Sequence, residues 1–296
     1  MSISLSNHHL DADPHRYSDV LSAVGAAADE AGLDTVWLPD HAVQADPTAG
    51  EDRDLFEPYA ALAFLASATR SVRLGTMVSA VTYRPPALLI KAVTTLDVLS
   101  GGRAWLGVGA GYLEQDATAM GLPLPPMSER FEYLEDTLEL ASRMWAGDER
   151  PFHGRRISLE APQLQPRALS RPRPRILVGG SGETRTLRLV TRHADAANFF
   201  DIPDGGSTIR HKLAVLGERC VEVGRDPSQI EITVSTRRGP AQTLDDFLGH
   251  CRDLAQLGVG HAILHSGPAW NPEGVRECGA VVDALADVTP QPWGQS

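Results

Sequence analysis

Short apolar runs alternate along this chain with longer segments in which apolar residues recur at every third or fourth position. This alternation is typical of repeated units of one β-strand and one α-helix. The pattern predicts eight strands, at residues 3–6, 35–38, 72–79, 104–108, 175–178, 196–199, 231–235 and 262–265. It predicts eight helices, at residues 17–31, 58–69, 86–99, 128–144, 183–192, 208–223, 243–257 and 273–286.

Eight such units of about 37 residues predict an α/β fold, the (β/α)8 TIM barrel, whose active site lies at the carboxyl ends of the strands. The segment 145–174 has no helical period and offers two short extended pieces around Phe152 and Ile157. We therefore expect residues 1–296 to form a single barrel domain, with residues 145–174 as an insertion after the fourth helix that lies over the barrel. A doubly wound sheet is the alternative, but it requires about six strands and a glycine fingerprint after the first strand, and the sequence has neither.

Composition narrows the class of protein. The chain has 296 residues, of which 42% are hydrophobic, and a formal net charge of −11. A chain of this kind buries a large core, and its acidic balance opposes binding to nucleic acid. The three cysteines, Cys220, Cys251 and Cys278, form neither a CxxC pair nor a metal-ligand set, which is typical of a reducing compartment. Because no apolar run could span a membrane and no secretion signal is recognisable, we expect a cytoplasmic protein without a membrane partner.

Asp40 and His41 directly follow the second predicted strand. A histidine at the mouth of a barrel can exchange a proton with a bound molecule near neutral pH. The alternative interpretation is that both residues only cap the loop.

Glycines follow the third and fourth predicted strands. Gly75 allows a bulge or the close approach of a flat ligand, although a plain buried strand is the more economical interpretation. The alternating glycines of residues 107–111 leave room for a planar ring, but they are not a dinucleotide fingerprint, because Tyr112 stands where its third glycine belongs. Glu114 is either a candidate acid or a solvated loop charge.

Residues 179–182, Gly-Gly-Ser-Gly, follow the fifth strand and lead into a predicted helix. Glycine-rich backbone at a helix amino terminus presents N–H groups to an anion, and Arg185 in the first turn could add a charge-assisted hydrogen bond to a phosphate. The alternative interpretation is that Arg185 is only a charged residue on the surface of the helix.

Two other clusters of charged or metal-binding residue types are weaker candidates for a functional site. Arg171, Arg173 and Arg175 precede the fifth strand, so we expect them at the opposite end of the barrel, in contact with solvent. His8 and His9 are adjacent and cannot share one face of a strand, so we expect no metal site there.

Taken together, the motifs resemble the bacterial luciferase-like monooxygenase superfamily, and within it the short actinobacterial oxidoreductases that use the deazaflavin coenzyme F420. The resemblance runs from about residue 33 to residue 236. The residues that carry it are LDTVWLPDH at 33–41, VRLGTMV at 72–78, YRPPALLIK at 83–91, TLDVLSGGR at 95–103, GVGAG at 107–111, GGSGE at 179–183 and TLRLV at 186–190.

The resemblance implies roles for individual residues. His41 matches a histidine that faces the central ring of the coenzyme, and Met77-Val78 falls where the family has a non-prolyl cis peptide that supports this ring. Gly179, Gly180 and Ser181 match the loop that holds the coenzyme phosphate. The expected cofactor contacts are therefore His41, Thr76, Met77, Val78, Ala110, Gly111, Gly179, Gly180, Ser181 and Arg185. Tyr112 departs from the acid found there in some sugar-phosphate dehydrogenases of the group, which argues against that activity.

The function implied is an oxidoreductase that transfers a hydride between coenzyme F420 and an organic substrate. His41 or Glu114 is the expected proton partner, with Asp40 as a further catalytic candidate. The nearest alternative is a monooxygenase that uses FMN and is served by a separate flavin reductase; the short chain favours the deazaflavin. Two further alternatives are a non-catalytic flavin-binding protein and a metal-dependent barrel hydrolase. The resemblance also implies a homodimer.

Overall fold

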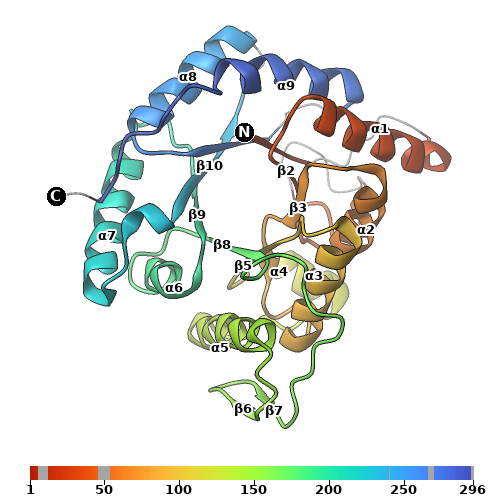
Figure 1. Cartoon of the computed structure of the whole chain (residues 1–296), viewed down its shortest axis with the longest axis vertical. Coiled ribbons are helices and arrows are strands. Elements are labelled where there is room, and N and C mark those ends of the chain that lie inside the picture. Colours follow the sequence, from red (N-terminus) through yellow and green to blue (C-terminus); the bar gives the residue numbers. More distant parts are fainter. Residues whose placement is uncertain (6–12, 46–53, 240, 266–269, 295–296) are drawn as a thin grey trace.

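The computed structural model describes residues 1–5, 13–45, 54–239, 241–265 and 270–294, which form a ring of parallel strands surrounded by helices (Figure 1). The strands of the ring are β1 (Ser2–Ser4), β2 (Thr35–Leu38), β3 (Arg73–Thr76), β4 (Ser79–Ala80), β5 (Trp105–Gly109), β8 (Arg175–Gly179), β9 (Ala196–Phe200), β10 (Glu231–Arg237) and β11 (His261–His265). The helices are α1 (Tyr17–Glu30), α2 (Pro58–Ala68), α3 (Pro86–Ser100), α4 (Glu114–Met120), α5 (Met127–Ala146), α6 (Thr186–His193), α7 (Ser207–Val223), α8 (Leu244–Gln256) and α9 (Pro272–Ala284).

The sheet has the strand order β3-β2-β1-β11-β10-β9-β8-β5-β4, and every pairing within it is parallel. β3 and β4 are two halves of one barrel strand, because β3 pairs with β2 while β4 pairs with β5. A bridge between Leu74 and Ala104 closes the ring. The predicted (β/α)8 barrel is confirmed.

Three local predictions differ from the structure. The short helix α4 was not predicted, because seven residues give too little helical period to recognise. α6 begins at Thr186 rather than at Glu183, so a turn separates the glycine-rich loop from the helix. The first strand ends at Ser4, and the adjacent histidines His8 and His9 lie outside the described residues.

The segment after α5 contains two extended pieces, as predicted: β6 (Phe152–His153) and β7 (Ser158–Leu159), which pair as an antiparallel hairpin. Its position differs from the expected one, because the hairpin lies beside the barrel, against α5 (Figure 1). The Asp136 carboxylate on α5 accepts hydrogen bonds from the backbone N–H groups of Arg155, Arg156 and Ile157. None of residues 147–174 lines the cavity described below.

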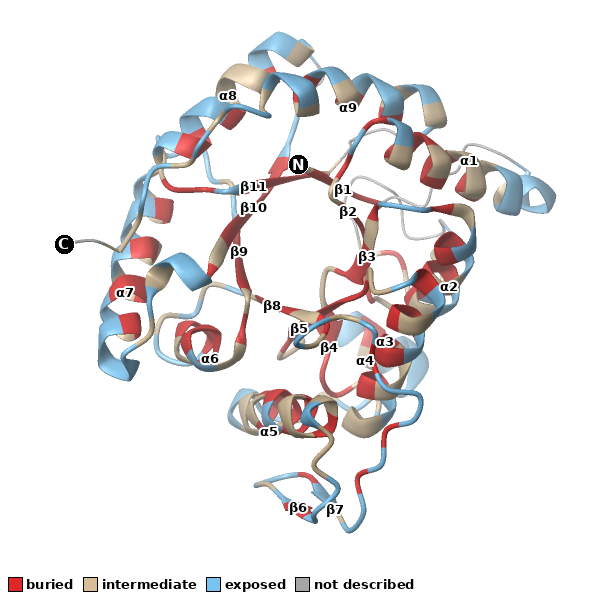
Figure 2. Ribbon diagram, in the orientation of Figure 1, coloured by how far each residue is buried: buried red, intermediate tan, exposed pale blue. Residues whose placement is uncertain are grey.

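Apolar side chains fill two layers. The larger layer lies between the sheet and the longer helices, each of which buries the face it turns toward the strands (Figure 2). Inside the barrel the rings of Trp37 and Trp105 lie 5.5 Å apart, both almost fully buried. A Cβ at Gly75 would lie 2.8 Å from atoms of both tryptophans. Gly75 therefore makes room for the two tryptophan side chains, whereas the sequence had suggested the close approach of a ligand.

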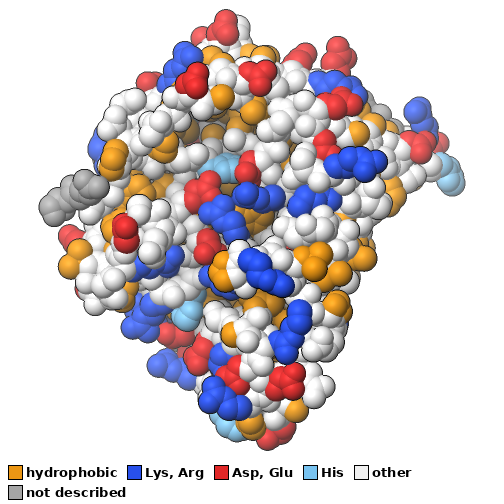
Figure 3. All heavy atoms as spheres, in the orientation of Figure 1, with side chains coloured by type: hydrophobic (Ala, Val, Ile, Leu, Met, Phe, Trp, Pro, Cys, Tyr) orange, Lys and Arg blue, Asp and Glu red, His pale blue; other side chains and the backbone are white. Residues whose placement is uncertain are grey.

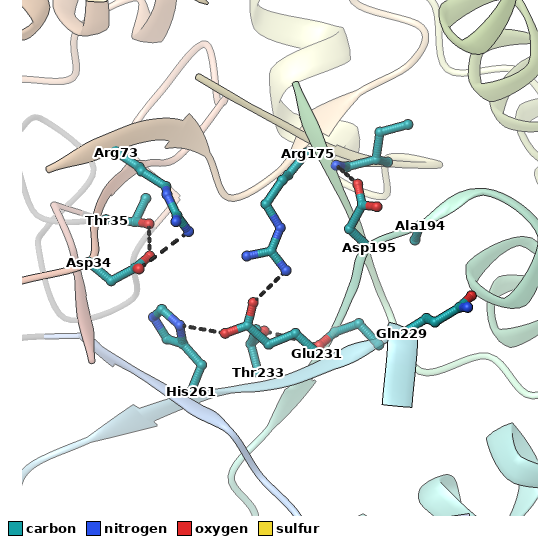
Figure 4. A network of polar contacts seen from close by, with 12 residues as sticks. Asp34, Thr35, Arg73, Arg175, Ala194, Asp195, Gln229, Glu231, Thr233 and His261 are labelled. Carbon is teal, nitrogen blue, oxygen red and sulfur yellow. Dashed lines mark hydrogen bonds and ion pairs between the residues drawn. The ribbon is translucent and has the colours of Figure 1, made fainter. Parts of the chain in front are cut away.

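Charged side chains close the barrel at the amino ends of its strands (Figure 4). The Arg175 guanidinium lies 2.8 Å from Glu231 and 4.2 Å from the centre of the Trp105 ring. His261 binds Glu231 through Nδ1 at 3.1 Å and Ser2 through Nε2 at 2.5 Å. Positive and negative side chains accordingly gather over the centre of the face drawn in Figure 3.

The arginines of the Arg-Pro-Arg-Pro-Arg run lie at this amino end, as predicted, but two of them are paired rather than simply solvated. Arg173 Nη1 lies 2.6 Å from Asp195 Oδ2, and Arg175 pairs with Glu231. Their partners are 22 and 56 residues away in sequence, so no local pattern could have indicated them.

The three cysteines are free and buried. No helix in the described ranges is both long and apolar enough to cross a membrane.

Candidate active site

A cavity of about 620 Å³ opens at the carboxyl ends of the barrel strands. This volume lies within the range typical of sites for small molecules. Its walls are mainly apolar, with Leu55, Val78, Phe131 and Phe200 among the lining residues. Polar groups stand at the strand ends, including Ser4 at the end of β1 and His41 after β2.

His41 lies at one side of this cavity, in the loop after β2, with 19% of its side chain exposed. Its Nδ1 atom lies 2.7 Å from Oδ2 of Asp116, a residue of α4 whose side chain is fully buried. The ring of Tyr112 meets the His41 ring edge-on, with the centroids 5.9 Å apart. His41 is thus held on two sides while it faces the cavity.

The Asp116 carboxylate is surrounded by donors. Its Oδ1 atom accepts hydrogen bonds from the backbone N–H groups of Ala42 at 2.9 Å and Val43 at 3.1 Å. Tyr83 donates its hydroxyl to Oδ2 at 2.8 Å. Burial alone would raise the pKa of Asp116, but the hydrogen bonds outweigh it and hold that pKa below its ordinary value.

Asp40 lines the cavity but is paired. Its Oδ2 atom accepts a hydrogen bond from Arg84 Nη1 at 2.5 Å, and Arg84 Nη2 binds Glu57 at 2.5 Å. The Arg84 guanidinium also lies 4.9 Å from the centre of the Tyr59 ring. Because Asp40 is 96% buried within this ion pair, its geometry is that of a support for the loop before His41 rather than of a free proton acceptor.

The floor of the cavity is the bulge between β3 and β4. The Met77–Val78 peptide bond is cis, as the resemblance implied. A Cβ at Gly107 would lie 1.8 Å from the carbonyl oxygen of Thr76, and Cβ atoms at Gly109 and Gly179 would lie 3.0 and 2.9 Å from the Val78 side chain. The absence of side chains at these glycines therefore makes room for the backbone and the Val78 side chain of the bulge. The sequence had instead suggested that the glycines after the fourth strand leave room for a ligand.

The glycine-rich loop forms another part of the wall. Gly179, Gly180, Ser181 and Gly182 all line the cavity, and α6 begins four residues later. Gly180 has φ +110°, a backbone conformation that favours glycine. The loop thus presents backbone groups and the Ser181 hydroxyl to the cavity, and it carries no larger side chain there.

Most of the predicted site residues meet at this cavity: Asp40, His41, Met77, Val78, Ala110, Gly111, Gly179, Gly180 and Ser181. Three do not line it. Thr76 is fully buried below the bulge, where its hydroxyl donates to Gly107 O at 2.9 Å. Glu114 is exposed at the start of α4, and Arg185 is an exposed residue whose guanidinium lies 5.4 Å from the Phe131 ring. The structure therefore does not support Glu114 as the proton partner.

Asp116 and Tyr83 are the functional candidates that sequence reasoning missed. Tyr83 belongs to a motif quoted for the resemblance, but its partner lies 33 residues away. Asp116 lies two residues after Glu114, and only knowledge that α4 begins at Glu114 would have shown which of the two carboxylates turns inward.

A second cavity of about 400 Å³ shares Phe200, Ser235, Arg237 and His265 with the first. His250 Nε2 lies 2.6 Å from Asp201 Oδ2 in its wall, and this hydrogen bond raises the pKa of His250. The described residues contain no cluster of three or more His, Cys, Asp or Glu side chains that could hold a metal ion.

Comparison with known families matches residues 2–256 to the luciferase-like monooxygenase model. The chain belongs to this family. Among curated relatives of this luciferase-like protein is the F420-dependent glucose-6-phosphate dehydrogenase of Kineococcus radiotolerans, 31% identical over 76% of this chain and 66% of that protein. The F420-dependent hydroxymycolic acid dehydrogenase of Mycobacterium tuberculosis is 29% identical over 72% of this chain and 57% of that protein. The chain therefore aligns with somewhat less than two thirds of the length of these relatives.

Among solved structures, a monooxygenase of Streptomyces bottropensis superposes with a TM-score of 0.77 at 19% identity, covering 96% of this chain and 98% of that one. Structural likeness at this identity supports the barrel fold.

Proposed function

We propose that this luciferase-like protein is an oxidoreductase that transfers a hydride between coenzyme F420 and an organic substrate. The observation that carries the proposal is one cavity with the paired His41 on one side, the Met77–Val78 bulge as its floor and a glycine-rich loop in its wall. The relatives named above are F420-dependent dehydrogenases, which favours the deazaflavin over FMN.

The residues present fit such a coenzyme. The cavity is large enough for a tricyclic ring, and its apolar floor at Met77 and Val78 suits one face of that ring. Gly179, Gly180 and Ser181 would hold the phosphate through backbone N–H groups and a hydroxyl. When bound, the deazaflavin supplies the hydride-transfer chemistry, while the protein supplies orientation and electrostatics.

The chain's own residues then bind and orient the reactants and move a proton. Apolar walls exclude water from the cavity, which strengthens the electrostatic interactions inside it. His41 holds or accepts the proton at Nε2, and its Nδ1 atom is engaged by Asp116. Asp40, in its pair with Arg84, holds the loop that carries His41.

Titration of the purified protein with oxidised F420 and, separately, FMN tests the proposal, followed by quenching of tryptophan and cofactor fluorescence. We expect micromolar binding of F420 and much weaker binding of FMN. Ser181→Asp places a negative charge at the loop and should weaken F420 binding at least tenfold. Ser158→Asp, on the exposed strand β7, adds the same charge away from the cavity and should leave binding unchanged.

The other outcomes separate the alternatives. Preference for FMN would make the protein a two-component monooxygenase that needs a flavin reductase as partner. Tight F420 binding with no turnover in a panel of alcohols, aldehydes and enones would favour a non-catalytic binding protein. Binding of neither cofactor would contradict the proposal.

We further infer that the chain forms one barrel domain with residues 145–174 as its insertion, and that it acts as a homodimer in the cytoplasm. Sheet pairing from β1 to β11 supports the single barrel. Light scattering during size-exclusion chromatography tests the dimer, for which twice the 31.8 kDa chain mass is expected.

A further inference from the structure

Asp116 joins three parts of the site through one carboxylate. It lies on α4, it binds His41 and two backbone N–H groups in the loop after β2, and it binds Tyr83 after β4. The four donor–acceptor distances lie between 2.7 and 3.1 Å, so both carboxylate oxygens carry two partners.

This arrangement determines which nitrogen of His41 carries the proton. An ionised carboxylate is an acceptor only, and the hydrogen bonds around Asp116 favour its ionised form. The two N–H groups of Ala42 and Val43 are obligate donors to Oδ1. His41 Nδ1 must therefore carry a hydrogen and donate it to Asp116 Oδ2. An unprotonated Nδ1 would direct its lone pair at the carboxylate oxygen 2.7 Å away, which is repulsive.

The other ring nitrogen of His41, Nε2, is available to a molecule bound in the cavity. Within the described ranges no residue forms a hydrogen bond with His41 Nε2, and His41 is one of the residues that line the cavity. A neutral ring with hydrogen on Nδ1 presents the Nε2 lone pair to whatever the cavity holds.

We propose that Asp116 is the positioning residue of His41: it fixes the Nδ1–H tautomer and, by tying the His41 loop to α4, aims Nε2 into the cavity. The claim about the tautomer is independent of the cofactor; its catalytic meaning rests on the proposed function. A carboxylate that binds the far side of a histidine in this way keeps the near nitrogen available and stabilises the ring when it gains a proton.

Asp116→Asn is the direct test. The amide retains the shape of the carboxylate, but its NH₂ group cannot accept from Tyr83 and His41 or from the two backbone N–H groups. If the amide oxygen stays with the backbone N–H groups, the NH₂ group faces Nδ1 and favours the ring with hydrogen on Nε2. Long-range ¹H–¹⁵N correlation spectra of protein labelled at histidine distinguish the two tautomers, and His41→Gln assigns the signals.

For the wild type we expect His41 to show hydrogen on Nδ1, at a pH where its chemical shifts indicate a neutral ring. In Asp116→Asn more than half of the neutral ring should carry hydrogen on Nε2. Glu183→Gln is the matched control, because the Glu183 carboxylate also contacts a histidine, His211 at 3.0 Å, but on the surface. This control should leave the His41 signals unchanged.

Tyr83→Phe removes one donor from Asp116 and keeps the carboxylate, so it should keep the wild-type tautomer. A wild-type ring with hydrogen on Nε2 would overturn the proposal, and so would an Asp116→Asn protein with the wild-type pattern. The wild-type spectrum decides the first point even if the asparagine variant does not fold.

F420 titration of the same variants separates the two proposals. If Asp116 acts on His41 and not on cavity shape, Asp116→Asn should bind F420 within about threefold of the wild type. Failure of the wild type to bind F420 would contradict the proposed function and leave the tautomer result standing. A loss of binding above tenfold in Asp116→Asn, with the tautomer unchanged, would instead make Asp116 a residue that shapes the cavity.

Discussion

Replacing Glu231 by glutamine removes the negative charge at the centre of the network that closes the amino end of the barrel. Burial alone would raise the pKa of Glu231, but His261 and Arg175 outweigh it and lower the pKa from 4.5 to about 2. Linkage converts the difference between these two values to about 3 kcal/mol of stability at neutral pH. Glu231 is only one quarter exposed, so solvent screens this interaction incompletely.

The sign of the pH dependence follows from the lowered pKa. A carboxyl whose folded pKa is depressed stabilises the protein fully above its unfolded value of 4.5, and this contribution is lost as the pH falls through about 2. We therefore expect Glu231→Gln to lower the free energy of unfolding by about 3 kcal/mol at pH 7 and by about 1.5 kcal/mol at pH 3.

Urea unfolding of both proteins at the two pH values measures this difference. The matched control is Glu222→Gln, because Glu222 pairs with Arg219 one turn away on the surface of α7 and is 56% exposed. That variant should lose less than about 1 kcal/mol, with little change between pH 7 and pH 3. Equal losses for Glu231→Gln at pH 7 and pH 3 would refute the reasoning, because the loss would then have no electrostatic origin.

Two further substitutions test the packing and the loop support. Gly75→Ala places a methyl group 2.8 Å from the Trp105 Cβ atom and 2.8 Å from the Trp37 indole ring, so it should lower stability by about 1 to 3 kcal/mol in thermal unfolding. An unchanged melting temperature would show that the two tryptophan side chains can move apart. Asp40→Asn removes the buried carboxylate that pairs with Arg84 and leaves the half-exposed Glu57 as the carboxylate partner of Arg84 among the described residues. It should cost about 3 kcal/mol in urea unfolding, whereas Glu57→Gln should cost less than about 1 kcal/mol. Similar losses for the two variants would show that Asp40 is not the main partner of Arg84.

The fold could be predicted because its information is local. Alternating apolar runs and helical periods identify the barrel strands and the long helices, and Gly101, with φ +75°, ends α3 as a left-handed cap. α4 shows the limit of this reasoning, since seven residues contain less than two full turns of period.

The site could be predicted only where residues stand directly at strand ends. His41 is such a residue, whereas Asp116 reaches the site through a helix that the pattern did not reveal. The glycines illustrate a different limit. Gly75 and Gly107 mark places where a side chain is not tolerated, but the sequence does not say whether a ligand, an indole ring or a carbonyl oxygen fills the space.

The bulge between β3 and β4 explains why the site lies where it does. The regular strand pairing of the barrel is interrupted at Met77 and Val78, because β3 ends at Thr76 and β4 begins at Ser79. Both residues pack against the cluster inside the barrel that contains Trp37 and Trp105. The interruption therefore rests on a buried apolar layer and places two apolar side chains on the cavity floor. Because this layer separates the floor from the charged network at the other end, we expect that network to affect stability more than ligand binding.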